Sequence, residues 1–313
     1  MKGTAPFHLF FFPYGPERTA HILLDGTSRL TDKRDSSMPG LSGTQTMSAK
    51  KNRQSWNDLS EYYQQSVRIS LEDVHYGPFS PGERDLRMIG EVEGLDVLEV
   101  GCGGGQNSIV LAKWGAKSVT GLDFSERQLA YARDLAAKQS VSVKFVLGRM
   151  EDLSQFADES FDLIASSHAM GYAEELDLVF RECGRVLRPN GHLVTCIVHP
   201  IQQLVWDALE SDDISRIGCY FGERRDVWSW NDKAGRPLAT FETKAPSFGD
   251  IVNGLIRAGF AIERVEEPQC YTYESVVSST KDRIPYRDVD IDRRFIEIGR
   301  RIPFSFIVRA RRT

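Results

Sequence analysis

The segment 97–105, with the sequence VLEVGCGGG, places an acidic residue directly before a glycine-rich turn. Its apolar run predicts a short buried strand, followed by Gly101, Gly103 and Gly105 at alternate positions. Glycine reaches backbone angles that are closed to other residues and lets a ligand approach the main chain. A helix predicted to begin near Gln106 would point its free N–H groups and positive dipole end into the turn. These residues therefore suit a ligand that carries a carboxylate or a phosphate.

A second acidic residue, Asp123, ends the next predicted strand, 18 residues after Gly105. A carboxylate at that place can accept hydrogen bonds from both hydroxyls of a ribose, which predicts a nucleoside ligand. The dinucleotide fingerprint G-x-G-x-x-G needs a third glycine where this chain has Gln106. A dinucleotide-dependent oxidoreductase is therefore the disfavoured alternative.

Strands and helices alternate from residue 95 to residue 198. The predicted strands are 95–100, 117–122, 142–147, 161–166 and 192–198, and the predicted helices are 105–115, 125–139 and 174–187. This alternation predicts parallel β-α-β units in a doubly wound α/β sheet. Such sheets bind ligands at the carboxyl ends of their strands. The residues that fall there are Gly101 to Gly105, Asp123, Met150, Glu151, Ser166, His168 and His199.

In order and spacing these stretches resemble the class I S-adenosylmethionine (SAM) methyltransferases, and among them the methyltransferase type 11 group. The resemblance covers roughly residues 56–266. It rests on the segments 99–105, 146–153, 160–167 and 180–193. It implies SAM as cofactor, a small-molecule acceptor, and a Rossmann-like seven-stranded sheet with the last strand antiparallel between the fifth and sixth. Relatives often carry Asp where this chain has Arg149, so the adenine edge is expected at the Met150 backbone and the Glu151 side chain.

The resemblance also implies a task for each cofactor-binding residue. Glu99 takes the methionine ammonium, and the N–H groups around Gly103 to Gln106 meet the carboxylate. Asp123 accepts the ribose hydroxyls. The remaining expected contacts are Gly101 and Gly105 in the turn, Phe124 near the adenine, Met150 and Glu151 at its edge, and the Ser166 carbonyl on the ammonium.

A general base contributes about 10²–10⁴-fold to a rate when the acceptor holds a proton. The candidates at the ligand-binding edge are His168, Tyr172 and His199, with His75 behind them. A lone histidine is more often structural, and His199 beside Pro200 is open to that interpretation. No metal site is expected, because Asp/His pairs at ligand spacing are missing. This argues against magnesium-dependent, catechol-type transfer.

After Pro200 the alternation stops, and residues 200–246 form an aromatic-rich insert. Large exposed aromatics are unusual unless they line a pocket or an interface, so we expect a cap over the acceptor site. The alternative is a structural subdomain with its own small core. The predicted acceptor-binding residues are Trp206, Tyr220, Phe221, Trp228 and Trp230 of the insert, Tyr63 of a helix over 48–66, and His75 and Tyr76 of the loop 75–81. This loop precedes a helix predicted over 83–89.

Four segments describe the expected organisation. Residues 1–46 are either an upstream extension, with Met38 or Met47 as the working start, or an arm for a possible homo-oligomer. Residues 47–199 form the SAM-binding core and 200–246 the cap. Residues 247–313 complete the sheet with a helix over 247–258, strands over 260–266 and 303–311, and a second insert at 267–302.

Composition narrows the choice of function. The net charge of −5 argues against a general nucleic-acid binder. The five scattered cysteines indicate neither disulfides nor zinc, and no apolar run approaches a membrane span, so a cytoplasmic enzyme is expected. The favoured acceptor is a small, largely apolar metabolite of specialised metabolism, aromatic or prenylated, methylated on O, N or C. The alternatives are a macromolecule such as tRNA, contacted by the basic residues 281–313, and a non-catalytic SAM-binding subunit.

Overall fold

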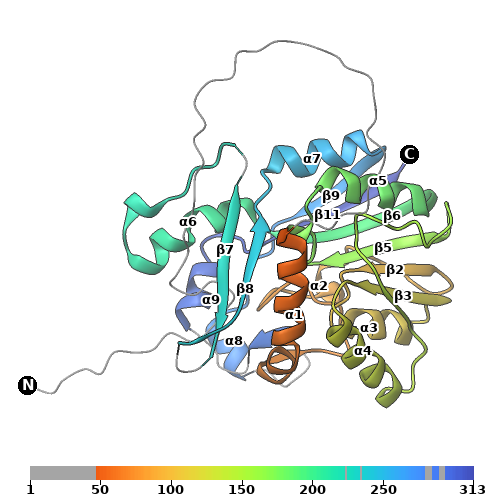
Figure 1. Ribbon diagram of the computed structural model, residues 1–313, viewed down its shortest axis with the longest axis horizontal. Helices are drawn as coiled ribbons and strands as arrows, with labels where there is room; N and C mark the ends of the chain where they lie inside the picture. Colours follow the sequence, from red (N-terminus) through yellow and green to blue (C-terminus); the bar gives the residue numbers. More distant parts are fainter. Residues whose placement is uncertain (1–46, 223, 233–234, 279–283, 289–292) are drawn as a thin grey trace, which may run out of the picture.

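A seven-stranded sheet forms the centre of the computed structural model, which describes residues 47–222, 224–232, 235–278, 284–288 and 293–313 (Figure 1). The strand order is β4-β3-β2-β5-β6-β11-β9. The strands are β2 (Asp96–Val100), β3 (Ser118–Asp123), β4 (Lys144–Leu147), β5 (Phe161–Ser167), β6 (Leu187–Val198), β9 (Phe260–Glu266) and β11 (Ser305–Arg312). Strands β2 to β6 are parallel, whereas β11 pairs antiparallel with β6 and β9. The predicted α/β sheet, with its last strand between the fifth and sixth, is confirmed.

Helices cover both faces of the sheet, as its buried central strands require. They are α2 (Glu83–Leu86), α3 (Gln106–Lys113), α4 (Glu126–Lys138), α5 (Leu176–Val186) and α7 (Phe248–Arg257). Successive side chains of strand β2 point to opposite faces of the sheet and join two different hydrophobic clusters. Leu98 joins the cluster that contains Phe180 of α5 and Leu255 of α7, and Val97 joins the cluster that contains Val110 of α3. Helices α4 and α7 each begin at a serine N-cap, whose side-chain oxygen accepts a backbone N–H of the first turn.

Two predicted boundaries are wrong. Strand β6 begins at Leu187 instead of residue 192, because the chain stays paired to β5 through a register shift. The helix predicted over 83–89 ends at Leu86, with Arg87 in the left-handed conformation. The buried Glu83 carboxylate then accepts the N–H groups of residues 88–90 at 2.8–2.9 Å, which replaces the last turn of the helix.

The remaining elements lie beyond the carboxyl ends of the parallel strands (Figure 1). They are α1 (Met47–Ser66), β1 (Val67–Ile69), η1 (Met170–Tyr172), α6 (Pro200–Ser211), η2 (Ile214–Arg216), β7 (Arg225–Asn231), β8 (Pro237–Lys244), α8 (Tyr273–Ser278), β10 (Tyr286–Asp288) and α9 (Arg293–Gly299). Strands β7 and β8 form an antiparallel hairpin, and β1 pairs with β10. The two inserts and the N-terminal helix thus meet at one edge of the sheet.

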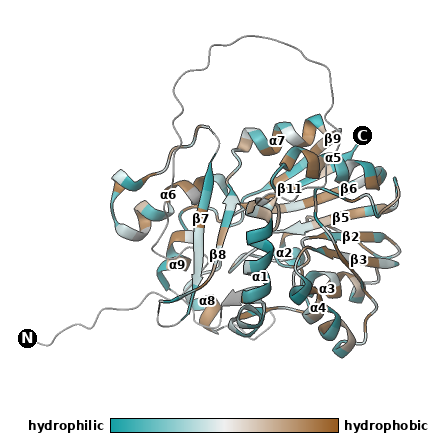
Figure 2. Cartoon of the chain, in the orientation of Figure 1, coloured by the Kyte–Doolittle hydropathy of each residue, from teal (hydrophilic) through white to brown (hydrophobic). Residues whose placement is uncertain are grey.

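Helix α1, confirmed over nearly its predicted range, connects this outer layer to the core. Figure 2 shows it as largely hydrophilic, and its buried side chains include Asn52 and Ser55. The Asn52 amide donates to the Glu242 carbonyl of β8 at 2.7 Å and accepts the Glu242 N–H at 2.9 Å. At its other side, Asn57 contacts the start of α4, where it accepts the Ser125 hydroxyl at 2.7 Å. Helix α1 is therefore fixed between the hairpin and the sheet by polar contacts.

No described helix combines the length and the apolar character needed to cross a membrane. Residues 1–46, including the predicted arm at Phe10 to Tyr14, lie outside the described part of the chain.

Candidate cofactor and acceptor site

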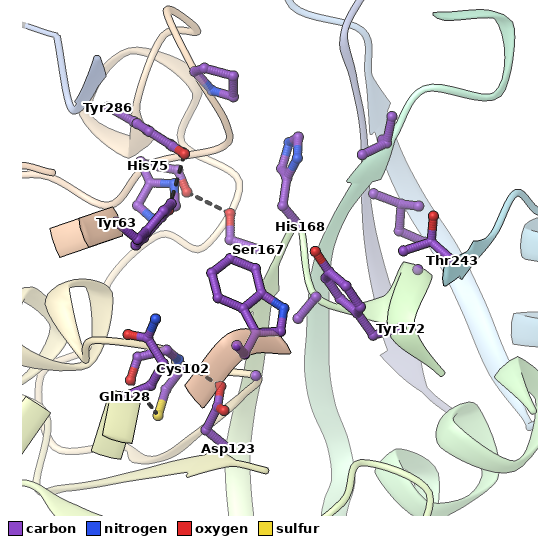
Figure 3. A pocket seen from close by; sticks show the side chains of 18 of the residues that line it. Tyr63, His75, Cys102, Asp123, Gln128, Ser167, His168, Tyr172, Thr243 and Tyr286 are labelled. Carbon is purple, nitrogen blue, oxygen red and sulfur yellow. Dashed lines mark hydrogen bonds between the residues drawn. The ribbon is translucent and has the colours of Figure 1, made fainter. Parts of the chain in front are cut away.

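One continuous cavity lies at the carboxyl ends of the central strands (Figure 3). Its cofactor half is lined by Glu99, Gly101 to Gly104, Gln106, Asp123, Phe124, Gln128 and Met150. Its acceptor half is lined by Tyr63, Ile69, His75, Pro78, His168, Tyr172, Gln202, Trp228, Trp230, Thr243, Lys244, Pro246, Tyr286, Phe295 and Phe304. Of the residues predicted at the strand ends, Gly101 to Gly104, Asp123, Met150 and His168 meet at this cavity.

The glycine turn takes the conformation that its residue types suggest. Gly101, Gly103 and Gly105 have φ angles of +73°, +50° and +77°, in the left-handed region. A Cβ on Gly103 would meet nothing within 4 Å, so open space lies in front of the turn. Gly105 shapes the start of α3 without lining the cavity.

Glu99 lies one residue before the end of β2 in a buried position, with 3% of its surface exposed. Its carboxylate accepts the Ser108 hydroxyl and has no ion-pair partner among the described residues. Burial raises the pKa of Glu99 to about 7, against hydrogen bonds from Ser108 and Asn107 that lower it. A buried carboxylate without a cation is complementary to an ammonium group.

Asp123 ends β3 beside the turn. Its Oδ2 accepts the Gly103 N–H and its Oδ1 accepts the Ser125 N–H, both at 2.8 Å. Burial raises its pKa to about 6, although these backbone hydrogen bonds oppose the shift. Each carboxylate oxygen keeps a second lone pair, which suits a pair of ribose hydroxyls.

Three glutamines connect α1 to the turn. The Gln106 amide donates to Gln64 at 2.8 Å, and the Gln64 amide donates to Gln128 at 2.8 Å. The Gln128 Nε2 is buried and has no hydrogen-bond partner. Gln128 lines the cavity beside the turn, although this atom is sealed from it. The buried acids Glu99 and Asp123 fit the ammonium and ribose portions of SAM.

Besides Gly105, two predicted cofactor residues do not line this cavity. Ser166, whose carbonyl was expected on the ammonium, is not part of the lining, whereas the next residue, Ser167, is. The Glu151 carboxylate forms an ion pair with Arg149 at 3.0 Å and accepts the Glu174 N–H at 2.8 Å. It lines an adjoining recess that also includes Phe124 and Met150, so its contact with the adenine stays a prediction.

The acceptor half has aromatic walls with a few polar groups. Figure 3 shows Tyr63 and Tyr286 near His75, with Tyr172 on the opposite side. The Tyr63 and Tyr286 hydroxyls are 3.0 Å apart, and the rings of His75 and Tyr286 are 5.1 Å apart, edge to face. The Trp230 Nε1 and the Gln202 Oε1 are buried without a hydrogen-bond partner.

Four predicted acceptor residues do not line this cavity. Trp206 packs in a separate buried cluster with Phe295 and Phe304. The Tyr76 hydroxyl is buried and donates to Glu83. Tyr220 accepts the Phe248 N–H at 3.1 Å, and Phe221 is 83% exposed. An aromatic-rich composition does not separate core residues from cavity residues, which explains these corrections.

His168 and His199 leave neighbouring strands, and only His168 lines the cavity. The His168 Nε2 lies 3.1 Å from the Ser305 hydroxyl. His199 is fully buried at the start of α6. Its Nδ1 accepts the Ile201 N–H at 3.1 Å, and its Nε2 lies 2.7 Å from Glu267. Both His199 nitrogens are therefore engaged in structural contacts, and its assignment as a base is corrected. Tyr172 also lines the cavity.

Comparisons with known proteins agree with this geometry. Residues 98–195 match the family model described as a methyltransferase domain. The chain is 40% identical over 126 residues to the uncharacterized methyltransferase YbaJ of Bacillus subtilis, covering 40% of this chain and 49% of YbaJ. It is 34% identical over 116 residues to a ubiquinone biosynthesis O-methyltransferase of Mesorhizobium japonicum, covering 37% of this chain and 46% of that protein. The chain thus spans about half the length of these curated relatives.

A solved S-adenosylmethionine dependent methyltransferase from Mesorhizobium loti extends the similarity beyond the matched domain. It is 27% identical with a TM-score of 0.52, and the match covers 73% of this chain and 96% of that chain. Residues 98–195 are thus a methyltransferase domain, and the sheet around them has the fold of the class I S-adenosylmethionine-dependent methyltransferases. SAM is the cofactor of this family, and the cofactor half holds the acids and N–H groups that suit it.

The sequence did not reveal several of the residues that line the cavity. They are Trp56, Gln128, Gln202, Thr243, Lys244, Tyr286, Phe295 and Phe304. Most come from α1 or from the two inserts, where no local motif marks a residue as facing a ligand. In the described part of the chain, no group of three or more His, Cys, Asp or Glu side chains could hold a metal ion.

Proposed function

We propose that this protein transfers the methyl group of SAM to a small, largely apolar acceptor with an aromatic or prenyl portion. One observation carries the proposal. The same cavity is lined by the buried acids Glu99 and Asp123 and by the aromatic walls that include Trp228, Trp230 and Tyr286. A nucleoside and an apolar molecule can therefore meet within it.

SAM supplies a methyl group that is already activated on a sulfonium. The contribution of this chain is then to bind, align and exclude water. Glu99 fixes the ammonium end and Asp123 fixes the ribose, and the aromatic walls orient the acceptor. Alignment of this kind can be worth about 7–11 kcal/mol of the barrier.

The polar groups of the acceptor half suggest what the acceptor carries. The Trp230 Nε1 is an unused donor and the Gln202 Oε1 an unused acceptor, and buried polar groups without partners cost free energy. Both atoms are sealed from the cavity, so the polar lining that an acceptor meets includes Thr243 and Lys244 instead. This lining suits an apolar body with at least one hydrogen-bonding group. The similarity to an O-methyltransferase supports oxygen as the methylated atom. The proposal includes a role in specialised metabolism. It also includes a cytoplasmic location, which the five cysteines without a disulfide support.

Calorimetric titration with S-adenosylhomocysteine tests the cofactor part. Asp123→Ala should weaken binding about 10–100-fold, because hydrogen bonds to charged groups are worth about 1.5–3 kcal/mol. The control is Asp134→Ala, which removes an exposed carboxylate on α4 and should leave the affinity unchanged. Absence of binding by the intact protein would contradict the proposal.

Labelled SAM with a panel of apolar metabolites tests the acceptor part. Methylation is expected on hydroxylated aromatic or prenylated members of the panel. Methylation of tRNA alone, with a strong dependence on salt, would contradict a small-molecule acceptor.

A further inference from the structure

Three atoms meet behind the acceptor half, where β5 ends and β11 begins. The Ser305 hydroxyl lies 2.7 Å from the Tyr76 carbonyl oxygen and 3.1 Å from the His168 Nε2. Ser305 itself is buried, with 1% of its surface exposed. The histidine ring stands at the exit of β5 in Figure 3.

The hydrogen positions follow from chemistry. Two oxygens 2.7 Å apart need a hydrogen between them, and a carbonyl has none, so the single Ser305 hydrogen points to Tyr76. Ser305 is then left with lone pairs only, and the His168 Nε2 must supply the hydrogen of the 3.1 Å contact. Neutral His168 therefore carries its proton on Nε2 and a lone pair on Nδ1.

The Nδ1 of His168 is available to a ligand. It accepts no hydrogen bond from the described residues. It is also not one of the buried side-chain atoms that lack a hydrogen-bond partner, so it is accessible. The ring lines the acceptor half. Burial lowers the pKa of His168 to about 4, against the Tyr76 carbonyl that raises it, so the ring is neutral near pH 7.

The backbone holds this arrangement in place. His168 has a φ of +54°, a left-handed conformation that is costly for a residue with a side chain. Its N–H donates to the Cys196 carbonyl at 2.8 Å. Gly77, at a φ of +104°, lets the loop approach, because a Cβ there would lie 2.4 Å from the His168 Nε2. A strained conformation supported from two sides is typical of a functional position.

We propose that Ser305 is a positioning residue that presents the His168 Nδ1 as a base, and that the acceptor is consequently a hydroxyl group. This rests on the methyl transfer proposed above. The acceptor oxygen forms a bond to the methyl carbon while the sulfur–methyl bond breaks, and its electron pair stays on sulfur. The hydroxyl proton moves to Nδ1 and later leaves to water. Bond formation makes that proton strongly acidic, so a weak base is sufficient.

The tautomer of His168 can be measured without knowing the acceptor. The full chain is labelled with ¹⁵N-histidine, and the His168 signals are assigned by their loss in His168→Gln. We expect a single tautomer with the proton on Nε2. Ser305→Ala should give a mixture of both tautomers, Ser305→Thr should restore the single form, and Ser167→Ala, a neighbouring hydroxyl, should leave it unchanged. A proton on Nδ1 in the wild type, or no change in Ser305→Ala, would overturn the role of Ser305.

The acceptor class is tested on the molecule that the labelled-SAM panel yields. His168→Gln should lower kcat about 10²–10⁴-fold, and Ser305→Ala about tenfold, with KM unchanged. Methylation of an alkene carbon, or full activity in His168→Gln, would overturn the hydroxyl acceptor. Titration with S-adenosylhomocysteine separates the two proposals. Variants that bind S-adenosylhomocysteine with normal affinity retain the cofactor site, so their loss of activity concerns the base. If the wild-type protein does not bind S-adenosylhomocysteine, the proposed methyl transfer is refuted, whereas the tautomer measurement still tests the role of Ser305.

Discussion

The two halves of the cavity are built in different ways. The cofactor half comes mostly from residues at the ends of β2 and β3 or directly after them, such as Glu99 and Asp123. Backbone N–H groups hold Asp123 in place. The acceptor half is assembled from the N-terminal helix, the β7–β8 hairpin and the second insert. Its residues Tyr63 and Tyr286 are far apart in the sequence, yet their hydroxyls lie 3.0 Å apart. The cofactor half is thus fixed by the sheet, and the acceptor half by packing between added segments.

This difference suggests that acceptor specificity can change without loss of the cofactor site. The hairpin has its own core of Trp228, Trp230 and Phe241, packed against Leu59 of α1. Both interpretations of the insert therefore have support in the hairpin, since Trp228 and Trp230 line the cavity and also form the core of the hairpin. The sharpest test is a substitution that damages one half only.

Trp230→Ala should show the largest effect. Trp230 is 2% exposed, and truncation of a buried tryptophan costs about 3–5 kcal/mol of unfolding free energy. Because Trp230 contacts Tyr63 and not the glycine turn, affinity for S-adenosylhomocysteine should stay within about threefold. Chemical denaturation and calorimetry measure the two quantities. Leu238→Ala, a 38% exposed position on the same hairpin, is the control and should cost less than about 0.5 kcal/mol. Loss of cofactor binding in Trp230→Ala would show that the halves are not independent.

The same division explains how much the sequence could predict. Glu99 and Asp123 were accessible because strand, turn and acid are neighbours in the chain, whereas the place of the last strand in the sheet came from the family resemblance. Gln202 and Phe295 were not, because their places depend on how α6 and α9 pack on distant elements. His199 shows the limit most clearly. It ends a strand at the predicted edge, but its partner Glu267 lies 68 residues later and turns it away from catalysis.

The pH dependence of cofactor binding probes the cofactor half alone. Burial raises the pKa of Glu99 to about 7, so below that pH a proton must leave before the ammonium can bind. Affinity for S-adenosylhomocysteine should fall as pH decreases from 8 to 6, approaching about tenfold per unit below pH 7. The free energy of unfolding depends on pH in the opposite direction. The cofactor-free folded state binds more protons than the unfolded chain, so this group makes the protein less stable as pH rises towards 7.

Glu99→Gln should weaken binding at pH 8 and remove most of this slope. Asp123, whose pKa is about 6, titrates lower and accounts for the dependence that remains near pH 6. A slope that persists unchanged in Glu99→Gln would show that another group controls the ammonium site.

The smallest expected effects come from a comparison of His168 and His199, which follow the neighbouring strands β5 and β6. His199→Asn keeps an N-cap acceptor for the Ile201 N–H and loses the contact with Glu267, so it should cost about 1 kcal/mol of stability. Binding of S-adenosylhomocysteine should be unchanged. His168→Gln should have the opposite pattern, with unfolding free energy nearly unchanged and transfer to a hydroxyl acceptor lost. Denaturation curves and single-turnover assays with labelled SAM measure both. If His199→Asn abolished transfer without loss of stability, the assignment of His199 as a structural residue would be wrong. Residues at the carboxyl ends of both β5 and β6 would then take part in catalysis.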